Sequence, residues 1–386
     1  MMDHNRNTKR WGSVNVVSIV LLVPLLLTAC ESKKEPQPKD NRSPTRGATA
    51  NIVEPPKPWP PRAATSTFLD RPADADLRLM NYNVLWNTIF EEESPEGAAK
   101  FARLVRALDP DILTLQEIGL PSWKRERNPN ARDWNTADVV QRMNAIHPPP
   151  EGGTWYAHQA YDNVIVSKYP LKMTAVDTEP RGQRRQALAL VDLPNDTFAI
   201  DFYLMNNHYK CCGGEDNDPQ RQQQSDAIIA WLRDARTPGG AIDLPPNTAI
   251  AVTGDLNIVG AFQPVQTLID GDIQDETRYG EDFPPDWDDT GLADLHPLHN
   301  IDGPDDYTWR NDDDEWNPGR LDYILYTDSV LDAVQSFILN TTTMNAGDLQ
   351  AAGLQRYDVT ADNEGRQFDH LPLLADFRVR TGEYSE

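Results

Sequence analysis

Short apolar runs of the kind that form buried β-strands alternate with stretches of helical spacing along most of the chain. Helices are predicted at 98–108, 137–146 and 220–232, and strands at 77–85, 112–115, 164–166, 187–193, 198–205, 249–252, 321–326, 334–339 and 371–379. This alternation is typical of an α/β domain built in layers. No internal repeat is visible, so we expect one large domain over residues 73–380, followed by a short tail at 381–386.

The first thirty residues have the pattern of a targeting segment. A basic stretch at 6–10 precedes an apolar run at 16–27, which is too short to span a bilayer comfortably. The run ends in Leu27-Thr28-Ala29-Cys30, which resembles the lipobox of bacterial lipoproteins. That resemblance implies a signal peptide at 1–29, lipidation of Cys30 and a place in the bacterial cell envelope. A plain secretory signal with an incidental cysteine is the alternative.

Residues 30–72 form a predicted tether. The segment is rich in proline and has few large apolar residues, so it cannot bury enough surface to offset the entropy of ordering. Its proline run at 55–61 favours an extended and fairly stiff chain. Glu31, directly after Cys30, is not the usual inner-membrane retention residue of lipoproteins, which favours the outer membrane, the periplasm or the extracellular face.

Charge narrows the choice of partners. The formal net charge is −24, and a field of that sign repels polyanions over the average surface. Broad, sequence-independent binding of nucleic acid is therefore disfavoured, although a locally basic groove remains open. Seventeen acidic residues and two basic ones fall between 270 and 315, which predicts a solvated, loop-rich insertion. A calcium site is the alternative there, but the spacing matches no EF-hand loop.

Polar residues occur repeatedly at the ends of the predicted strands. Such ends converge on a cleft in layered α/β folds, and carboxylates and amides gathered there suit a hard cation such as Mg²⁺. Each residue alone also has an ordinary explanation as a turn or capping residue. The residues are Asn83, Glu117, His208, Asp255, Asn257, Asp322, Asp369 and His370.

The ordered set of segments resembles the deoxyribonuclease-I-like superfamily of endonucleases, exonucleases, sphingomyelinases and inositol-polyphosphate phosphatases. The matching pieces are NYNVLW, LQE, NNH, GDLN, RLDYIL and FDHLPL, and they span residues 77–380 in the family order. The resemblance implies a four-layer α/β sandwich, in which two packed mixed β-sheets are flanked by helices. It also implies a phosphoesterase that depends on Mg²⁺ or Mn²⁺ and acts as a monomer.

The resemblance assigns roles position by position. The implied metal ligands are Asn83, Glu117 and Asp369. The implied catalytic residues are His208, Asp255, Asn257, Asp322 and His370, with Asp322 orienting His370. The implied phosphate contacts are Asn206, Asn163 and Arg185. Two histidines can supply hydrogen bonds or protons near neutral pH, and an Asp behind a His fixes its tautomer.

Two places depart from the family pattern. Asp162 stands before Asn163 where many members have Gly, which puts the role of Asn163 in question. The NNH segment continues as Tyr-Lys-Cys-Cys-Gly-Gly, and Cys211 and Cys212 are either a strained vicinal disulfide or two thiols. Arginines near Arg185 either bind phosphate or hold a hairpin.

Two substrate classes remain open within this reading. The first is a small or lipid-derived phosphoester in the envelope, which the tether and the acidic charge favour. The second is nucleic acid, because the segment 123–134 after Glu117 is basic and aromatic and could grip a backbone by charge and stacking. An exposed loop is the ordinary explanation of that segment. A catalytically silent binding module is the third, more distant hypothesis.

Overall fold

The computed structural model describes residue 59 and residues 63–175, 186–214, 216–311, 316–359 and 367–380. The predicted signal segment, Cys30, most of the predicted tether, Arg185 and the tail at 381–386 lie outside the described residues. Among the helices of the described ranges, none combines the length and the apolar composition needed to cross a membrane.

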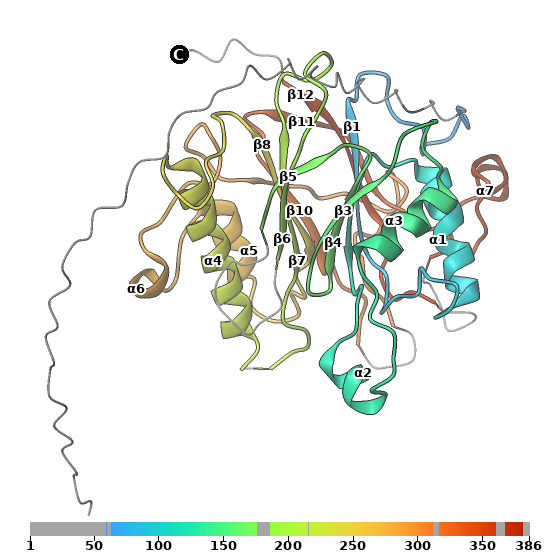
Figure 1. The fold of residues 1–386 in the computed structure, drawn as a ribbon, viewed down its shortest axis with the longest axis horizontal. Helices are drawn as coiled ribbons and strands as arrows, with labels where there is room; N and C mark the ends of the chain where they lie inside the picture. Colours follow the sequence, from blue (N-terminus) through green and yellow to red (C-terminus); the bar gives the residue numbers. More distant parts are fainter. Residues whose placement is uncertain are drawn as a thin grey trace, which may run out of the picture. The chain divides into compact units, whose positions relative to one another are not determined.

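Two six-stranded sheets form the centre of the domain (Figure 1). Sheet A has the order β11-β12-β1-β2-β4-β3 and sheet B the order β5-β6-β7-β8-β10-β9. Both sheets are mixed, because β1 and β2 run parallel in sheet A and β7 and β8 run parallel in sheet B. Sheet A contains β1 (Leu77–Asn83), β2 (Ile112–Gln116), β3 (Tyr156–Ala160), β4 (Asn163–Ser167), β11 (Leu331–Ile338) and β12 (Leu373–Val379). Sheet B contains β5 (Leu171–Ala175), β6 (Ala187–Val191), β7 (Phe202–His208), β8 (Ala249–Asp255), β9 (Ala293–Asp294) and β10 (Asp322–Tyr326).

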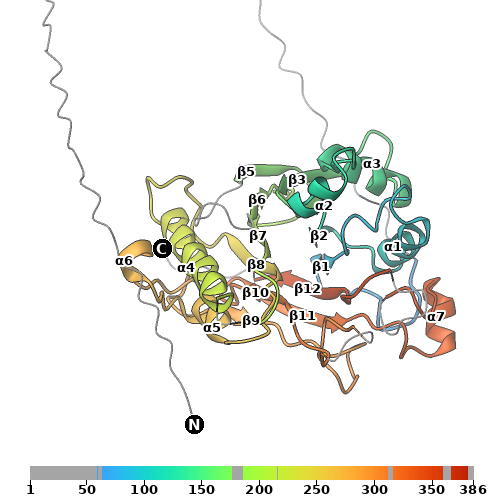
Figure 2. The ribbon, with the colours of Figure 1, turned by 90° about the horizontal axis from the view of Figure 1, so that it is seen from below.

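Helices lie on the outer side of each sheet, which gives the four layers (Figure 2). The helices α1 (Pro95–Leu108) and α3 (Thr136–Ile146) lie beside sheet A, and α4 (Asp218–Arg236) and α5 (Gln263–Asp270) lie beside sheet B. Successive side chains of β7 point to opposite faces of sheet B, so both faces are covered. Phe202 and Leu204 belong to the core shared with sheet A, whereas Tyr203 and Met205 belong to the core under α4. The expected four-layer sandwich is confirmed.

Every strand and helix predicted from the sequence is present, with ends that differ by a few residues. The largest difference is β7, which starts at Phe202 rather than at residue 198 and runs on to His208. The sequence missed α2 (Ser122–Arg127), α5, α6 (Glu276–Tyr279), α7 (Ala346–Ala352), β3, β5 and β9. Both β3 and β5 lie at sheet edges and are only partly buried, so they lack the apolar run that marks a central strand.

The described part of the acidic region, residues 270–311, is loop-rich, as expected, but it is not simply solvated. Its strand β9 pairs with β10 at the edge of sheet B, and Leu292 and Leu295 are buried. Asp286 is fully buried as well, and its burial is tolerated because its carboxylate accepts hydrogen bonds from Ser329 and from the Trp287 backbone. The segment therefore extends sheet B rather than projecting from it, and its acidity alone concealed these buried positions.

A buried polar network links the two sheets just below the ends of β1, β2 and β7. Gln116 donates to Asn81 Oδ1 at 2.8 Å and to Asn206 Oδ1 at 2.7 Å, and Asn206 donates to the carbonyls of Leu115 and Val164. Asn81 in turn donates to Asp322. These bonds fix how sheet B lies on sheet A at the edge where the strand-end residues gather, because buried polar groups are costly unless paired.

Candidate active site

Strand register brings three of the sequence-predicted residues into one row. His208 lies opposite Asp255 in the β7–β8 pair, and Asp255 lies opposite Asp322 in the β8–β10 pair. All three residues are buried, and they lie side by side at the ends of three neighbouring strands of sheet B. The ends of β1 and β2 meet this row from sheet A, since the Asn83 amide donates to Asp255 Oδ2 at 3.0 Å.

His208 is held by a carboxylate that the sequence analysis did not assign. His208 Nδ1 and Asp162 Oδ2 are 2.8 Å apart, and both side chains are almost completely buried. Asp162 lies in the turn between β3 and β4, and its backbone carbonyl accepts a hydrogen bond from Ile118 N–H. Asp162 was visible in the sequence only as a departure from the family pattern, and its pairing with a residue 46 positions away gave no local signal.

His370 has a matching arrangement on the other side of Asp255. His370 Nδ1 and Asp322 Oδ2 are 2.7 Å apart, as expected for an orienting carboxylate. Burial opposes the charge of the imidazole, but the carboxylates of Asp322 and Asp255 outweigh it and raise the pKa of His370 to about 10. Asp255 Oδ2 lies 3.5 Å from His208 Nε2 and 3.6 Å from His370 Nε2.

Glu117 stands just beyond β2 with a backbone φ of +67°, a region that non-glycine residues seldom adopt. Asn87 holds this conformation. Its backbone N–H donates to the Glu117 carbonyl, its Nδ2 donates to the Gly119 carbonyl at 2.7 Å, and its Oδ1 accepts from the Gly119 N–H at 2.7 Å. The Glu117 carboxylate accepts hydrogen bonds from Asn83 Nδ2 and from Trp86 N–H. Strain of this kind concentrates at functional sites.

The carboxylate of Glu117 is poorly neutralised by the protein around it. Burial raises its pKa to about 7; Asp369 and Asp162 add to the rise, and His208 and His370 oppose it. Asp369 is therefore within electrostatic reach of Glu117, and the role of the two carboxylates as metal ligands stays a prediction. Asp369 is half-buried beside His370, where its carbonyl accepts a hydrogen bond from Arg310 N–H.

The donors present fit a divalent cation of the hard, oxygen-binding kind. Glu117 and Asp369 offer carboxylates, and Asn83 offers an amide whose nitrogen now faces Glu117 and Asp255, so ligation through its oxygen requires a half-turn of the amide. Within the ranges that the structure describes, no three His, Cys, Asp or Glu side chains are grouped closely enough to hold a metal alone. Mg²⁺ is commonly bound by one or two carboxylates together with substrate phosphate, and Glu117 and Asp369 supply two carboxylates.

The remaining predicted residues are divided between the cleft and the interior. Asn257 lies next to the row, with its N–H donating to Asp255 Oδ1 and its side chain to the Tyr209 carbonyl. Asn163 is buried at the start of β4, next to Asp162. Arg185 lies outside the described residues, so its predicted phosphate contact stays a prediction.

Asn206 does not face the cleft, which corrects the expectation that it contacts phosphate. Its amide is fully buried and bonds Gln116 and two main-chain carbonyls between the sheets. Since β-strand side chains alternate, Asn206 and His208 point to the same inner face of β7, but only His208 reaches the end of the strand. Asn206 therefore positions the sheets rather than the substrate.

The basic segment after Glu117 lies at the rim of the site. Lys124, in α2, places its ammonium 5.5 Å from the centre of the Trp86 ring. Burial lowers the pKa of Lys124, and it outweighs the carboxylates of Glu93 and Glu117, which act to raise that pKa. Lys124 is thus within electrostatic reach of the candidate metal ligand. Arg132 covers the Trp134 ring and pairs with Asp138, so that part of the segment is engaged within the protein.

Comparison with known proteins gives a family match for this chain. The family model described as the Endonuclease/Exonuclease/phosphatase family matches residues 80–340, which include Asn83, Glu117, His208, Asp255 and Asp322. The match ends before Asp369 and His370, and the structure brings those two residues to the same site. Comparison with the curated proteins finds no match.

Solved structures with similar folds have low sequence identity to this chain. The crystal structure of ANGEL2, titled a 2′,3′-cyclic phosphatase in complex with adenosine-2′,3′-vanadate, is 15% identical, with a TM-score of 0.48 over 80% of this chain and 97% of that one. Humanized D. rerio TDP2 is 14% identical, with a TM-score of 0.46 over 78% and 98% of the chains. An endonuclease/exonuclease/phosphatase from Beutenbergia cavernae is 18% identical, with a TM-score of 0.44 over 79% and 72%.

Proposed function

Because the chain belongs to the endonuclease/exonuclease/phosphatase family, whose members are phosphoesterases and nucleases, we propose that it hydrolyses phosphodiester bonds with a divalent metal, Mg²⁺ or Mn²⁺. We further propose that Cys30 carries a lipid anchor and that the tether at 30–72 holds the domain away from a membrane of the bacterial envelope. The substrate in this reading is a small or lipid-derived phosphoester.

One observation carries the catalytic proposal: two histidines approach one carboxylate from opposite sides. Each histidine is fixed through Nδ1 by its own buried Asp, so each Nε2 faces Asp255 at 3.5 or 3.6 Å. These separations leave both Nε2 atoms positioned to donate to an oxygen of a bound phosphoester. Structural ion pairs in a protein interior have no reason to converge in this way.

The residues of the chain divide the reaction between them. Asp255, oriented by the Asn257 N–H, accepts a proton from the attacking water. His208 and His370 bind the phosphoryl oxygens and stabilise the charge that grows on them, and one of them protonates the leaving oxygen. Asp162 and Asp322 each accept the Nδ1–H of one imidazole and fix its orientation, so that the protonated ring presents its second proton on Nε2 to the substrate. Trp86 and Asn83 hold the carboxylate of Glu117 in place through their hydrogen bonds.

The cation completes the charge balance of the proposed site. When bound, it supplies charge neutralisation at the phosphoryl oxygens and a Lewis acid for the nucleophile or the leaving group. The chain's own contribution is two carboxylates, the buried Glu117 and the half-buried Asp369, which lie within electrostatic reach of each other and would hold the cation.

The test is hydrolysis of bis(p-nitrophenyl) phosphate by the purified protein with Mg²⁺, with Mn²⁺ and with EDTA. Turnover should require the metal, and His370→Ala and Asp255→Asn should each lower kcat by at least about 100-fold. His147→Ala is the matched control, because His147 also pairs with an Asp, Asp109 at 2.7 Å, but lies outside the site. Metal-independent turnover, or full activity in the His370 and Asp255 variants, would contradict the assignment.

Nuclease activity is the second candidate, because α2 brings a basic segment to the rim of the site. It predicts degradation of plasmid or single-stranded DNA with a strong decrease as salt rises. Hydrolysis of the small diester with little effect on plasmid would favour the first proposal. Charge reversal at Arg127, in α2, should then affect only the polymer reaction.

A further inference from the structure

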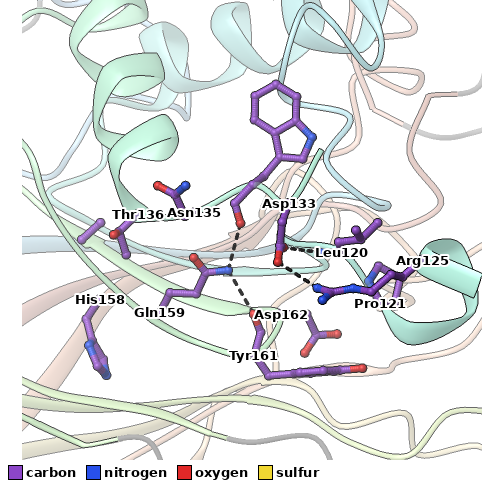
Figure 3. Close-up of a pocket in the computed structure, with 12 residues that line it drawn as sticks. Leu120, Pro121, Arg125, Asp133, Asn135, Thr136, His158, Gln159, Tyr161 and Asp162 are labelled. Carbon is purple, nitrogen blue, oxygen red and sulfur yellow. Dashed lines mark hydrogen bonds and ion pairs between the residues drawn. The ribbon is translucent and has the colours of Figure 1, made fainter. Parts of the chain in front are cut away.

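His208 has a different neighbour on each side. On one side, Asp162 holds it through Nδ1 and lines a pocket of about 610 Å³ beside the turn between β3 and β4 (Figure 3). The described lining of that pocket includes Asp162 but not His208, so the buried carboxylate closes the pocket toward the histidine. On the other side, β7 ends at His208 and leads into a turn with two adjacent cysteines, Cys211 and Cys212. The proposed hydrolysis makes no use of these thiols.

The two thiols are close to each other and reachable from solvent. Cys211 is half-buried and Cys212 is exposed, and Cys212 Sγ donates to Cys211 Sγ at 3.2 Å. Lys210 places its ammonium 3.8 Å from Cys211 Sγ. Reactive cysteines typically occur in partly exposed, electropositive surroundings of this kind. The pair is therefore placed to react first with a thiol reagent from solvent and then internally.

A buried arginine holds the backbone of this turn. Arg221 in α4 is completely buried, and its Nη1 donates to the carbonyls of Lys210 at 2.7 Å and of Cys212 at 3.0 Å. These two carbonyls lie on either side of Cys211. Cys212 itself has a backbone φ of +72°, a region that non-glycine residues seldom adopt. The conformation of the turn thus depends on its bonds to Arg221.

The same turn is bonded to the catalytic row through Tyr209. The Tyr209 N–H donates to the Asp255 carbonyl at 2.9 Å, and the Tyr209 carbonyl accepts a hydrogen bond from Asn257 Nδ2 at 3.3 Å. The Asn257 N–H in turn donates to Asp255 Oδ1. One residue separates Tyr209 from Cys211, so a change of backbone at Cys211 has a short path to Asp255.

A disulfide between neighbouring cysteines requires this backbone to move. Adjacent Cα atoms lie about 3.8 Å apart across a trans peptide, whereas the Cα atoms joined by a disulfide are usually about 4.4–6.8 Å apart. The bond would close a small ring that contains the peptide between Cys211 and Cys212. We therefore expect the carbonyls of Lys210 and Cys212 to shift relative to Arg221. A distorted disulfide is also easily reduced, which makes the change reversible.

We propose that Cys211 and Cys212 are a reversible redox site, at which a low-molecular-weight disulfide closes the vicinal bond and lowers the activity of the catalytic row. The exposed Cys212 thiolate attacks one sulfur of the reagent and releases a first thiolate. The Cys211 thiolate then attacks Cys212 Sγ, and a second thiolate leaves. The pair gives up two electrons and two protons, and the reagent gains both as two thiols. The inference goes beyond the proposed hydrolysis, and its effect on rate rests on that function.

The chemical test is oxidation of the full protein with glutathione disulfide, followed by alkylation and peptide mapping by mass spectrometry. The peptide with Cys211 and Cys212 should be two hydrogen atoms lighter and unalkylated, and dithiothreitol should restore two alkylated thiols. Cys211→Ser is the matched control and should stop at a mixed disulfide on Cys212. Two alkylated thiols in the oxidised wild type, a persistent mixed disulfide there, or a bond to Cys30 or to a second chain would overturn the proposal.

The kinetic test compares the oxidised and reduced forms on bis(p-nitrophenyl) phosphate with Mg²⁺. Oxidation should lower kcat about three- to tenfold, the effect of losing one hydrogen bond such as that from Asn257 to Tyr209, and dithiothreitol should reverse it. The double variant Cys211→Ser with Cys212→Ser should keep the reduced wild-type rate under both conditions. An unchanged kcat in wild type that carries the bond, or an equal loss in the double variant, would refute the coupling.

Amide hydrogen exchange separates this proposal from the proposed function, because it needs no turnover. Oxidation should speed the exchange of the Tyr209 and Asn257 amides, whose N–H groups bond Asp255, at least about threefold. If the bond forms and exchange rises while neither form hydrolyses a phosphodiester, the redox site stands and the proposed function fails. If the protein is a hydrolase but the bond never forms, or if exchange at both amides is unchanged, the redox site fails and the proposed function stands.

Discussion

Replacement of Asp162 by Asn tests the candidate site with little change of shape. Asp162 Oδ2 lies 2.8 Å from His208 Nδ1, and the two side chains are 3% and 1% exposed. The amide keeps an oxygen that can accept the Nδ1–H, so the tautomer survives while the negative charge is lost. The structural role of the turn also survives, because Ile118 N–H bonds the backbone carbonyl of Asp162 rather than its side chain.

The size of the effect follows from this geometry. A hydrogen bond to a buried charged group contributes about 1.5–3 kcal/mol, and we expect the bond from His208 to Asp162 to matter most when His208 donates to the phosphoryl oxygens in the transition state. If this free energy of about 1.5–3 kcal/mol is lost in the transition state and not in the bound ground state, kcat falls by roughly 10- to 150-fold with little change in KM. Asp162→Ala also frees the imidazole to rotate, so we expect about a further tenfold loss.

The assay is saturation kinetics on bis(p-nitrophenyl) phosphate across a range of pH, together with the thermal midpoint of unfolding. Asp162→Asn should lower kcat, because the amide no longer places a negative charge behind His208. Asp109→Asn, in the His147–Asp109 pair outside the site, is the control for a purely structural effect. A kcat for Asp162→Asn within roughly a factor of two of wild type, or an equal loss in Asp109→Asn, would refute the role of Asp162.

Three further predictions follow from other parts of the structure. Burial opposes the charge of Asp109, but His147 and Lys168 outweigh it and lower the pKa of Asp109 to about 2. The ionised Asp109 therefore stabilises the fold fully above the pKa of the unfolded chain, and this contribution is lost as the pH falls toward 2. In urea, the free energy of unfolding of Asp109→Asn should fall by about 2 kcal/mol less than that of the wild type between roughly pH 5 and pH 2. Glu117→Gln should raise the Mn²⁺ concentration for half-maximal activity at least about tenfold, measured by metal titration of the assay, because a neutral ligand replaces a carboxylate. Asn206→Ala should lower the free energy of unfolding by about 3 kcal/mol in urea, since it leaves buried partners unsatisfied; a raised KM at full stability would instead restore Asn206 as a phosphate contact.

The sequence predicted the layered fold because the central strands are short apolar runs with clear limits. It failed at the edges, where β3 and β5 are partly exposed and their alternation is weak. It also failed in the acidic region, where buried Leu292 and Leu295 stand among many carboxylates. Composition describes the average of a segment, whereas a single pair of buried residues is enough to join it to a sheet.

The site was predicted well where a residue ends a strand, and poorly where a side chain's partner decides its role. Asp255 and His208 could be placed from strand ends alone. Asn206 could not, because it lies two positions before His208 on the same face of β7. Only its hydrogen bonds to the main-chain carbonyls of Leu115 and Val164 in sheet A show that its amide is not available to a substrate. Asp162 was missed for the opposite reason, since its partner is 46 residues away in the other sheet.

Both histidine–aspartate pairs join the two sheets, and this decides where catalysis can occur. Asp162 follows a strand of sheet A and holds His208 of sheet B, whereas Asp322 begins a strand of sheet B and holds His370, which precedes β12 of sheet A. Each sheet thus supplies one histidine and the carboxylate for the other.

Neither sheet alone contains a complete pair, so the site exists only when the sandwich is closed in one register. Asn83 of sheet A, bonded to Asp255 of sheet B, adds a third link of the same kind. A slip of one residue in β7 would turn His208 to the helix side of sheet B and break its bond to Asp162. The buried network around Gln116 and Asn206 is what opposes such a slip, so residues that never touch the substrate determine whether the catalytic pairs form.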